Sequence, residues 1–227
     1  MRLRIVTALV AGTCLLAQEA TPKPPTRTGE QERVGDGGRE ILILGADAAG
    51  FEKLRPSQRK FAYYLSRAAI AGNDIQYLQN HRSSLDIRNL LETINEHREG
   101  LDPKIAEGLD EYLKMVWVHH GQYRHWQHTK FVPRQLTFEQ LKKAVAQAKK
   151  HGAKFELKKG ESLDRMLARL KPHIFDHKVE ALQVNPAQGA DPIATSSNGF
   201  YDPGLKLSDI EALPKELQNK VNVRFAL

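Results

Sequence analysis

The sequence predicts a mainly helical α+β domain, with about seven helices and two or three short strands. Apolar residues recur every three or four positions through most of the chain between residues 61 and 170. Residues that favour helix N-termini precede several of these stretches. Strand-like patterns are short and far apart, so the expected sheet is small and incomplete.

The strongest helical pattern begins after Asp102, which can cap a helix, with Pro103 suited to its first turn. One apolar face continues to His120, and Gly121 is expected to end the helix. Many polar side chains are costly to bury unless each is paired, so we expect the next stretch to line a cleft. It contains Tyr123, Arg124, His125, Trp126, His128, Lys130 and Phe131.

Further helices and strands follow from the same kinds of pattern. Thr137 and Gln140 form a capping box at the start of one helix. Ser162 can cap another helix, which Pro172 is expected to end. The other expected helices cover residues 61–69, 75–78, 84–94, 137–152, 162–171, 175–184 and 208–211. The expected strands are residues 41–44, 154–157 and 221–227.

The N-terminus predicts export. Residues 1–20 combine a positive start, a short apolar run and small residues suited to cleavage, which is typical of a signal peptide. A retained signal anchor is the alternative, and Cys14 is a weak lipoprotein candidate. After cleavage we expect no stable membrane span and no cysteine, in a periplasmic or secreted protein. Residues 21–39 are expected to form a disordered linker, and residues 40–227 the folded domain.

The formal net charge is +7, but acidic and basic residues alternate along most of the expected helices. Solvated helix faces explain this pattern better than a nucleic-acid footprint does. We therefore expect no nucleic-acid partner.

Three segments resemble one known family. Residues 121–133, Gly-Gln-Tyr-Arg-His-Trp-Gln-His-Thr-Lys-Phe-Val-Pro, are similar to a segment of the dipeptidyl peptidase III family that ends in Thr-Lys-Phe-Val-Pro. Residues 61–72 resemble the first long helix of that family. Residues 197–204 resemble its Asn-Phe-Tyr-x-Pro-Gly turn. The three segments occur in the order that the family has.

The resemblance implies a zinc exopeptidase that removes dipeptides from peptide N-termini. Its zinc motif, His-Glu-x-x-Gly-His, is not present in this chain, where no His is followed by Glu. Residues 40–227 would then be an N-terminal part of the lower lobe of a two-lobed peptidase. The implied partners are peptides and the catalytic lobe, and zinc would bind the longer family members but not this chain.

The C-terminal strand pattern suggests the same interpretation. Residues 221–227 alternate between apolar and polar side chains, as in a half-buried strand. Such a strand needs a sheet beside it, and few other strands are expected. We therefore expect a truncated domain.

Trp126 and Tyr123 are the candidate substrate-binding residues, and no catalytic residue is expected. The resemblance implies that Trp126 faces a peptide cleft, with Tyr123 nearby. The alternative is that Trp126 only packs its own loop.

Metal binding by the histidines is weakly supported. His119, His120, His125 and His128 are close in sequence, but His119 and His120 point about 100° apart on a helix. His173 and His177 are four residues apart, without the intervening Glu of a zinc peptidase helix. Packing at helix ends is the simpler role for each.

Two functions remain in view. One is an exported, catalytically silent fragment of a dipeptidyl peptidase III-like enzyme, since no group here can activate water. The other is an exported helical module that binds peptides or proteins.

Overall fold

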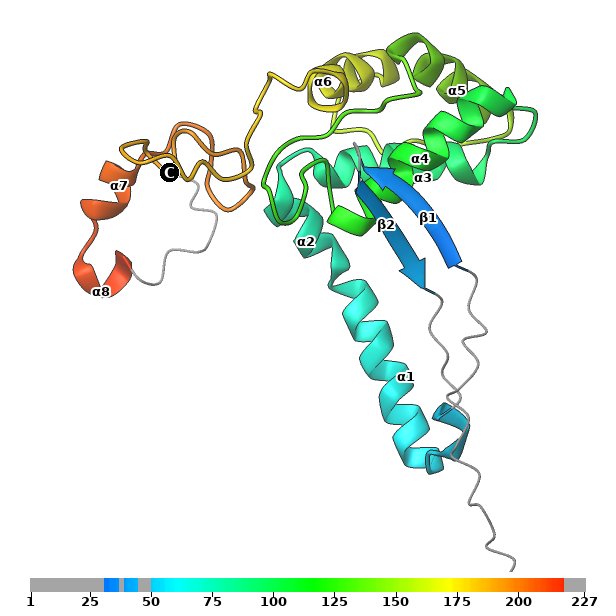
Figure 1. Ribbon diagram of the computed structural model, residues 1–227, viewed down its shortest axis with the longest axis horizontal. Coiled ribbons are helices and arrows are strands. Elements are labelled where there is room, and N and C mark those ends of the chain that lie inside the picture. The colour runs from blue at the N-terminus through cyan, green and yellow to red at the C-terminus, as the bar shows by residue number, and fades with distance from the viewer. Residues whose placement is uncertain (1–30, 37–38, 45–49, 219–227) are drawn as a thin grey trace, which may run out of the picture.

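The computed structural model describes residues 31–36, 39–44 and 50–218. This part of the chain is mainly helical, as the sequence predicts (Figure 1). The strands are β1 (Gln31–Asp36) and β2 (Arg39–Leu44). A 3-10 helix (Phe51–Lys53) precedes α1 (Pro56–Ala71), α2 (Asn73–Asn80), α3 (Ser84–Glu96), α4 (Pro103–His119), α5 (Phe138–Lys150), α6 (Leu163–Phe175), α7 (Leu207–Glu211) and α8 (Lys215–Gln218).

The core lies between α3, α4, α5 and α6, which form one body in Figure 1. Each helix directs its apolar stripe into this body, and fully buried side chains include Leu91, Leu109, Leu141 and Leu170. The described part of the chain therefore holds a packed four-helix core, and the remaining elements surround it.

The predicted caps of three core helices are confirmed. Asp102 accepts hydrogen bonds from the backbone at the start of α4, and Ser162 does the same for α6. Thr137 and Gln140 form the expected capping box at the start of α5.

The expected end of α6 at Pro172 is wrong. The helix continues for one more turn to Phe175, and Pro172 lies inside it. Its carbonyl accepts from the backbone N–H of Asp176, and Ile174 is buried in the core. Burial of Ile174 stabilises a last turn that proline alone disfavours.

The strands differ in part from the prediction. β2 contains the expected strand 41–44, and it pairs antiparallel with β1, with Gln31 opposite Leu44. β1 lies in the stretch expected to be linker, so that assignment is wrong for residues 31–36. Residues 154–157 form no strand, because charged residues alternate with only two apolar ones and no neighbour pairs with them. The expected strand 221–227 and the signal peptide lie outside the described residues.

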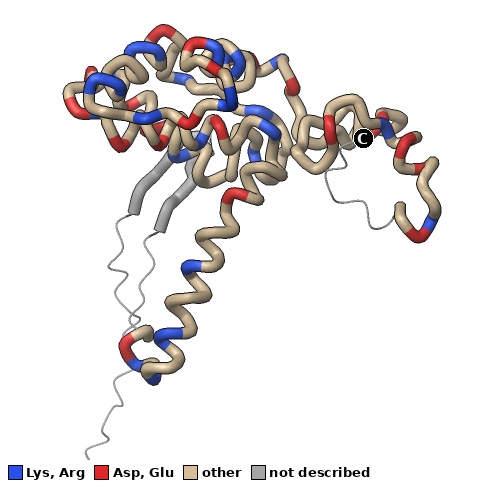
Figure 2. The backbone as a smooth tube through the Cα atoms, turned by 180° about the vertical axis from the view of Figure 1, so that it is seen from behind, with Lys and Arg blue, Asp and Glu red and all other residues tan. Residues whose placement is uncertain are grey.

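Helix α1 projects from the core as a single rod (Figure 1). The helix itself is where the periodicity predicts, but its apolar stripe is not buried, and no residue of α1 is. Phe61 remains 69% exposed and Leu65 58%. Along α1 the charged residues are Arg and Lys only, as Figure 2 shows.

Residues 176–218 form an arm that leaves the core after α6 and carries α7 and α8 (Figure 1). The helix expected at 175–184 is not present; this stretch runs as turns and irregular backbone. No helix within residues 50–218 has both the length and the apolar character needed to cross a membrane.

Candidate functional site

The site begins where α4 ends. His120 takes a left-handed conformation, with φ of 53°, and Gly121 follows with φ of 145°. The chain thus turns one residue before the predicted glycine. A Cβ on Gly121 would lie 2.2 Å from Oδ1 of Asn80, so this close approach requires glycine.

Residues 123–130 then form a tight turn, which we call the Trp126 hairpin. An antiparallel bridge joins Tyr123 to Lys130. The backbone N–H of Arg124 donates to the carbonyl of Thr129 at 2.9 Å, and that of His128 donates to Arg124 at 2.9 Å. These bonds close the base of the turn around its three-residue tip.

Trp126 lies at this tip and is 82% exposed. Its only ring contact in the described residues is with His125, edge to face, with 5.2 Å between ring centroids. An indole so exposed on a hydrogen-bonded turn has its apolar face available to a ligand.

Tyr123 is placed differently from the prediction. It is fully buried, and its hydroxyl donates to the backbone carbonyl of Glu180 at 2.6 Å. Burial raises the pKa of this hydroxyl above its usual value. Tyr123 therefore supports the hairpin from within and does not share a surface with Trp126.

Hydrogen bonds join one edge of the hairpin to the arm. The backbone N–H of Lys130 donates to Ala181 at 3.0 Å, and that of Gln183 donates to His128 at 2.7 Å. The Lys130 ammonium also donates to the carbonyls of Asp176 and Val179. The path of the arm near residue 180 consequently fixes the hairpin.

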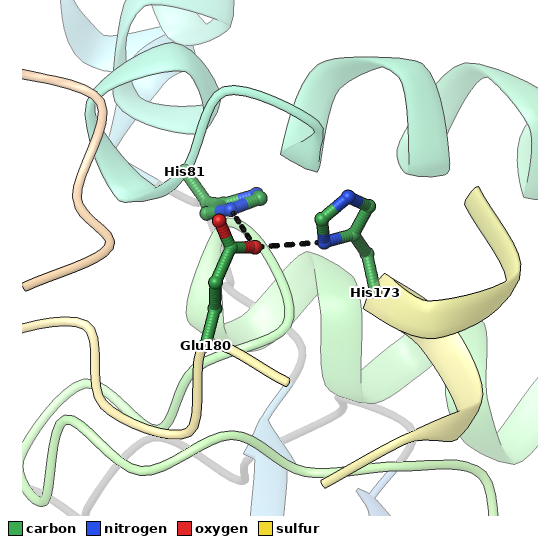
Figure 3. A group of neighbouring side chains, drawn as sticks. All are labelled: His81, His173 and Glu180. Atoms are coloured by element: carbon green, nitrogen blue, oxygen red, sulfur yellow. Dashed lines mark hydrogen bonds and ion pairs between the residues drawn. The ribbon is translucent and has the colours of Figure 1, made fainter. Parts of the chain in front are cut away.

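Glu180 anchors this part of the arm to the core (Figure 3). Its Oε2 accepts from Nε2 of His81 at 2.9 Å, and Nδ1 of His173 lies 2.8 Å from the same oxygen. Within the described residues Nδ1 of His173 has no aligned hydrogen bond, so this contact is a close approach of the ring to the carboxylate. Arg82 pairs with Oε1. We call Glu180 with His81, Arg82 and His173 the Glu180 clasp.

The clasp joins three separate elements. His81 lies in the turn between α2 and α3, His173 in the last turn of α6, and Glu180 on the arm (Figure 3). Arg82 follows His81 in the same turn. Glu180 itself has a φ of 49°, a conformation that non-glycine residues adopt at an energetic cost. The contacts of its side chain and carbonyl hold it there.

Hydrogen bonds fix the protonation of His81. Its Nδ1 accepts from the backbone N–H of Ser83 at 3.0 Å, and the Gln122 amide lies 2.8 Å away. Because a backbone N–H can only donate, Nδ1 must be bare and Nε2 must carry the proton. The neutral ring therefore donates to Glu180.

Burial and pairing shift the pKa values of the clasp. His81 is fully buried, and burial lowers the pKa of its ring below the usual value. Burial alone would raise the pKa of Glu180, but the contacts with His173 and His81, together with the charge of Arg82, hold it well below its usual range. Glu180 is thus an anion in contact with three basic residues, His81, Arg82 and His173.

His81, His173 and Glu180 are also the one group of three potential metal ligands in residues 50–218, with ligand atoms within 4.8 Å of one another. The surroundings do not fit a metal. If Nε2 of His81 bound the ion, Nδ1 would need a proton and would face the Ser83 N–H, donor against donor. Arg82 and Lys130 already neutralise Glu180, so a divalent cation would be repelled.

The histidines singled out in the sequence do not converge. His119 is buried, with Nδ1 accepting from the backbone of His125, whereas His125 itself is exposed at the hairpin tip. His177 lies beyond the end of α6, so it cannot share a helix face with His173. His173 instead joins His81, a residue with no motif around it. Only the three-dimensional structure brings the two together.

A cleft of about 320 Å³ adjoins the clasp. One wall is Arg82 and Glu180, and the other is the turn at residues 193–205, which includes Tyr201. Asn198 accepts from the backbone of Phe200 in this turn, as expected of a structural motif.

No protein-family model matches the chain, and no curated protein is similar enough to match it.

Proposed function

We propose that this chain is a peptide-binding, catalytically silent part of an exported, dipeptidyl peptidase III-like exopeptidase. The Trp126 hairpin would receive an extended peptide, and zinc and the water-activating groups would come from a catalytic lobe that contains the His-Glu-x-x-Gly-His motif. In this proposal the chain itself binds no zinc and removes no dipeptide alone.

One observation carries the proposal. Trp126 is 82% exposed on a turn whose base is closed by hydrogen bonds, and it lies in the segment that resembles the peptidase family. An aromatic side chain on a hydrogen-bonded turn offers large contact area and has few rotatable bonds to order on binding. The neighbouring Gln127 and His125, both exposed, add polar groups suited to a peptide backbone.

The test is a binding titration with short peptides. Purified protein, residues 21–227, is titrated with unblocked peptides of three to eight residues and binding is followed by calorimetry. Trp126→Ala should weaken binding about five- to thirtyfold, because stacking on one aromatic is worth on the order of 1–2 kcal/mol.

Trp117→Phe is the matched control. Trp117 lies on α4, outside the hairpin, and is also partly exposed, but its indole N–H donates to Glu92 on α3 at 2.8 Å. Equal affinity of Trp126→Ala and the parent protein would contradict the proposal.

A free-standing peptide- or protein-binding module is the second candidate. The packed core of α3 to α6 favours it, since such a core can stabilise a domain without another lobe. The two candidates separate when the protein is mixed with a catalytic lobe carrying the zinc motif: only the first predicts that dipeptide release appears.

A further inference from the structure

We propose that Glu180 is a positioning residue for Trp126: its carboxylate, held by His81, Arg82 and His173, keeps the Trp126 hairpin in place, and proton uptake by the clasp releases it. The inference deepens the proposed function, because it makes peptide binding at Trp126 depend on pH. It rests on contacts that extend without a break from the clasp to the hairpin.

The first step links the clasp to the arm. Glu180 is the arm residue whose side chain contacts both the α2–α3 turn and α6. Its left-handed backbone is unfavourable for a glutamate and needs these contacts to persist. Loss of the charge on Glu180 would therefore free the backbone at this point.

The second step links the arm to the hairpin. The carbonyl of Glu180 accepts from Tyr123 at 2.6 Å, and the next residue, Ala181, accepts from the backbone of Lys130. The two donors, Tyr123 and Lys130, are the residues whose bridge closes the hairpin. A shift of residues 180 and 181 must consequently alter the base of the turn that carries Trp126.

The charged groups around the clasp determine the direction of the pH response. His81 and Arg82 face Glu180 from the α2–α3 turn, and His173 faces it from α6. Tyr123 and Lys130 lie on the hairpin side. The charged neighbours on the arm are Asp176, His177, Lys178 and, across the cleft, Asp202.

At His81 and Glu180 the closed clasp holds fewer protons than the open one. In the closed state His81 has no site for a second proton without losing the Ser83 bond, and Glu180 stays ionised. In the open state His81 and Glu180 regain ordinary pKa values. His81 then takes up a proton below about pH 6.5, and Glu180 below about pH 4.5. Acid therefore favours the open state, by up to about tenfold per pH unit for each group that gains a proton.

The test follows the mobility of Trp126 directly. In a Trp117→Phe background Trp126 is the sole tryptophan, and its time-resolved fluorescence anisotropy reports motion of the hairpin. Between pH 7.5 and 5 the wild-type clasp should release the hairpin, seen as a fall in residual anisotropy while the far-ultraviolet circular dichroism of the helices stays constant. Peptide affinity should fall over the same range.

Three variants test the role of Glu180. Glu180→Gln should show the mobile hairpin already at pH 7.5, with a flattened pH profile. Glu161→Gln removes a carboxylate that pairs with Arg169 outside the clasp, and it should follow the wild type. Arg82→Gln alters a partly exposed residue, so folding is retained, and it should move the transition to higher pH.

The inference would be overturned if the anisotropy of Trp126 did not change with pH or in Glu180→Gln and Arg82→Gln. It would also be overturned if the anisotropy changed only when helicity is lost. If the hairpin responds as expected but no peptide binds, the clasp stands and the proposed function fails. If peptides bind with no pH dependence between pH 7.5 and 5, the proposed function stands and the clasp inference fails.

Discussion

Gly121 is the residue on which the shape of the site depends most directly. It combines a φ of 145° with contact to Asn80 and Ser84, both buried. The Ser84 hydroxyl lies 3.1 Å from Oδ1 of Asn80 and 2.7 Å from the Gln122 amide oxygen, and these two acceptors share its single proton. One network thus supports the end of α4, the α2–α3 turn and His81.

Gly121→Ala should destabilise the protein by about 2–4 kcal/mol, because the new Cβ meets buried polar atoms and the backbone is strained as well. Urea unfolding measures the change. Gly152→Ala is the matched control: its φ is also positive, at 87°, but nothing lies within 4 Å of the added carbon. It should lose only about 1 kcal/mol. Equal losses for the two variants would show that the Asn80 contact is unimportant.

His81 should titrate below its ordinary range. Burial lowers its pKa, and the Ser83 N–H blocks the second protonation site. A pH titration of the ring nitrogens by NMR should give a neutral ring protonated at Nε2 at pH 7 and a midpoint below 6.5. A ring protonated at Nδ1, or a midpoint above 6.5, would contradict the hydrogen-bond assignment.

At the scale of elements, α1 differs most from what periodicity suggests. Its sequence has a clear apolar stripe, and the helix forms, but the stripe is exposed along its whole length. Periodicity indicates that a helix has a face to cover; it carries no information on what lies opposite. The exposed large apolar residues of α1 are Phe61, Tyr63, Tyr64, Leu65 and Ile70, and apolar side chains exposed together are typical of an interaction surface.

Phe61→Gln and Leu65→Gln should each change the free energy of unfolding by less than about 0.5 kcal/mol, because both side chains are exposed. Leu109→Ala, in the core on α4, is the comparison and should lose about 2–5 kcal/mol. Thermal or urea unfolding distinguishes the two classes. A loss above about 1 kcal/mol for either α1 variant would mean that another part of the protein covers this face.

At the scale of the whole molecule, the core helices can be predicted from the sequence, whereas the cluster of residues at the site cannot. Local signals such as Asp102, Thr137 and Ser162 predict the core helices well, because caps and stripes act within a few residues. The exposed position of Trp126 agrees with a stretch unsuited to a core, but that expectation is wrong for Tyr123, Lys130 and Phe131, which are buried, and Phe131 packs in the core. The cleft is lined by other residues. His81, His173 and Glu180 meet only through tertiary packing, so no spacing in the sequence predicts their cluster.

Acid should destabilise the whole protein. The pKa values of His81 and Glu180 are both lowered in the folded state. A group whose pKa is lower in the folded than in the unfolded protein stabilises the fold at pH values above its unfolded-state pKa, and this stability is lost as the pH falls. The loss begins below about pH 6.5 for His81 and below about pH 4.5 for Glu180. Urea unfolding at pH 7.5 and 5 measures the effect. A free energy of unfolding that is unchanged or higher at pH 5 would contradict these shifts.

Peptide binding at the Trp126 hairpin can be followed residue by residue in an NMR titration. The two indole N–H signals, from Trp117 and Trp126, are resolved in one spectrum and followed as an unblocked peptide is added. The proposed site predicts that the Trp126 signal and the amides of residues 123–130 shift in a saturable way, while the Trp117 signal stays in place. Saturable shifts elsewhere with an unmoved Trp126 signal, or no shift at all, would contradict it.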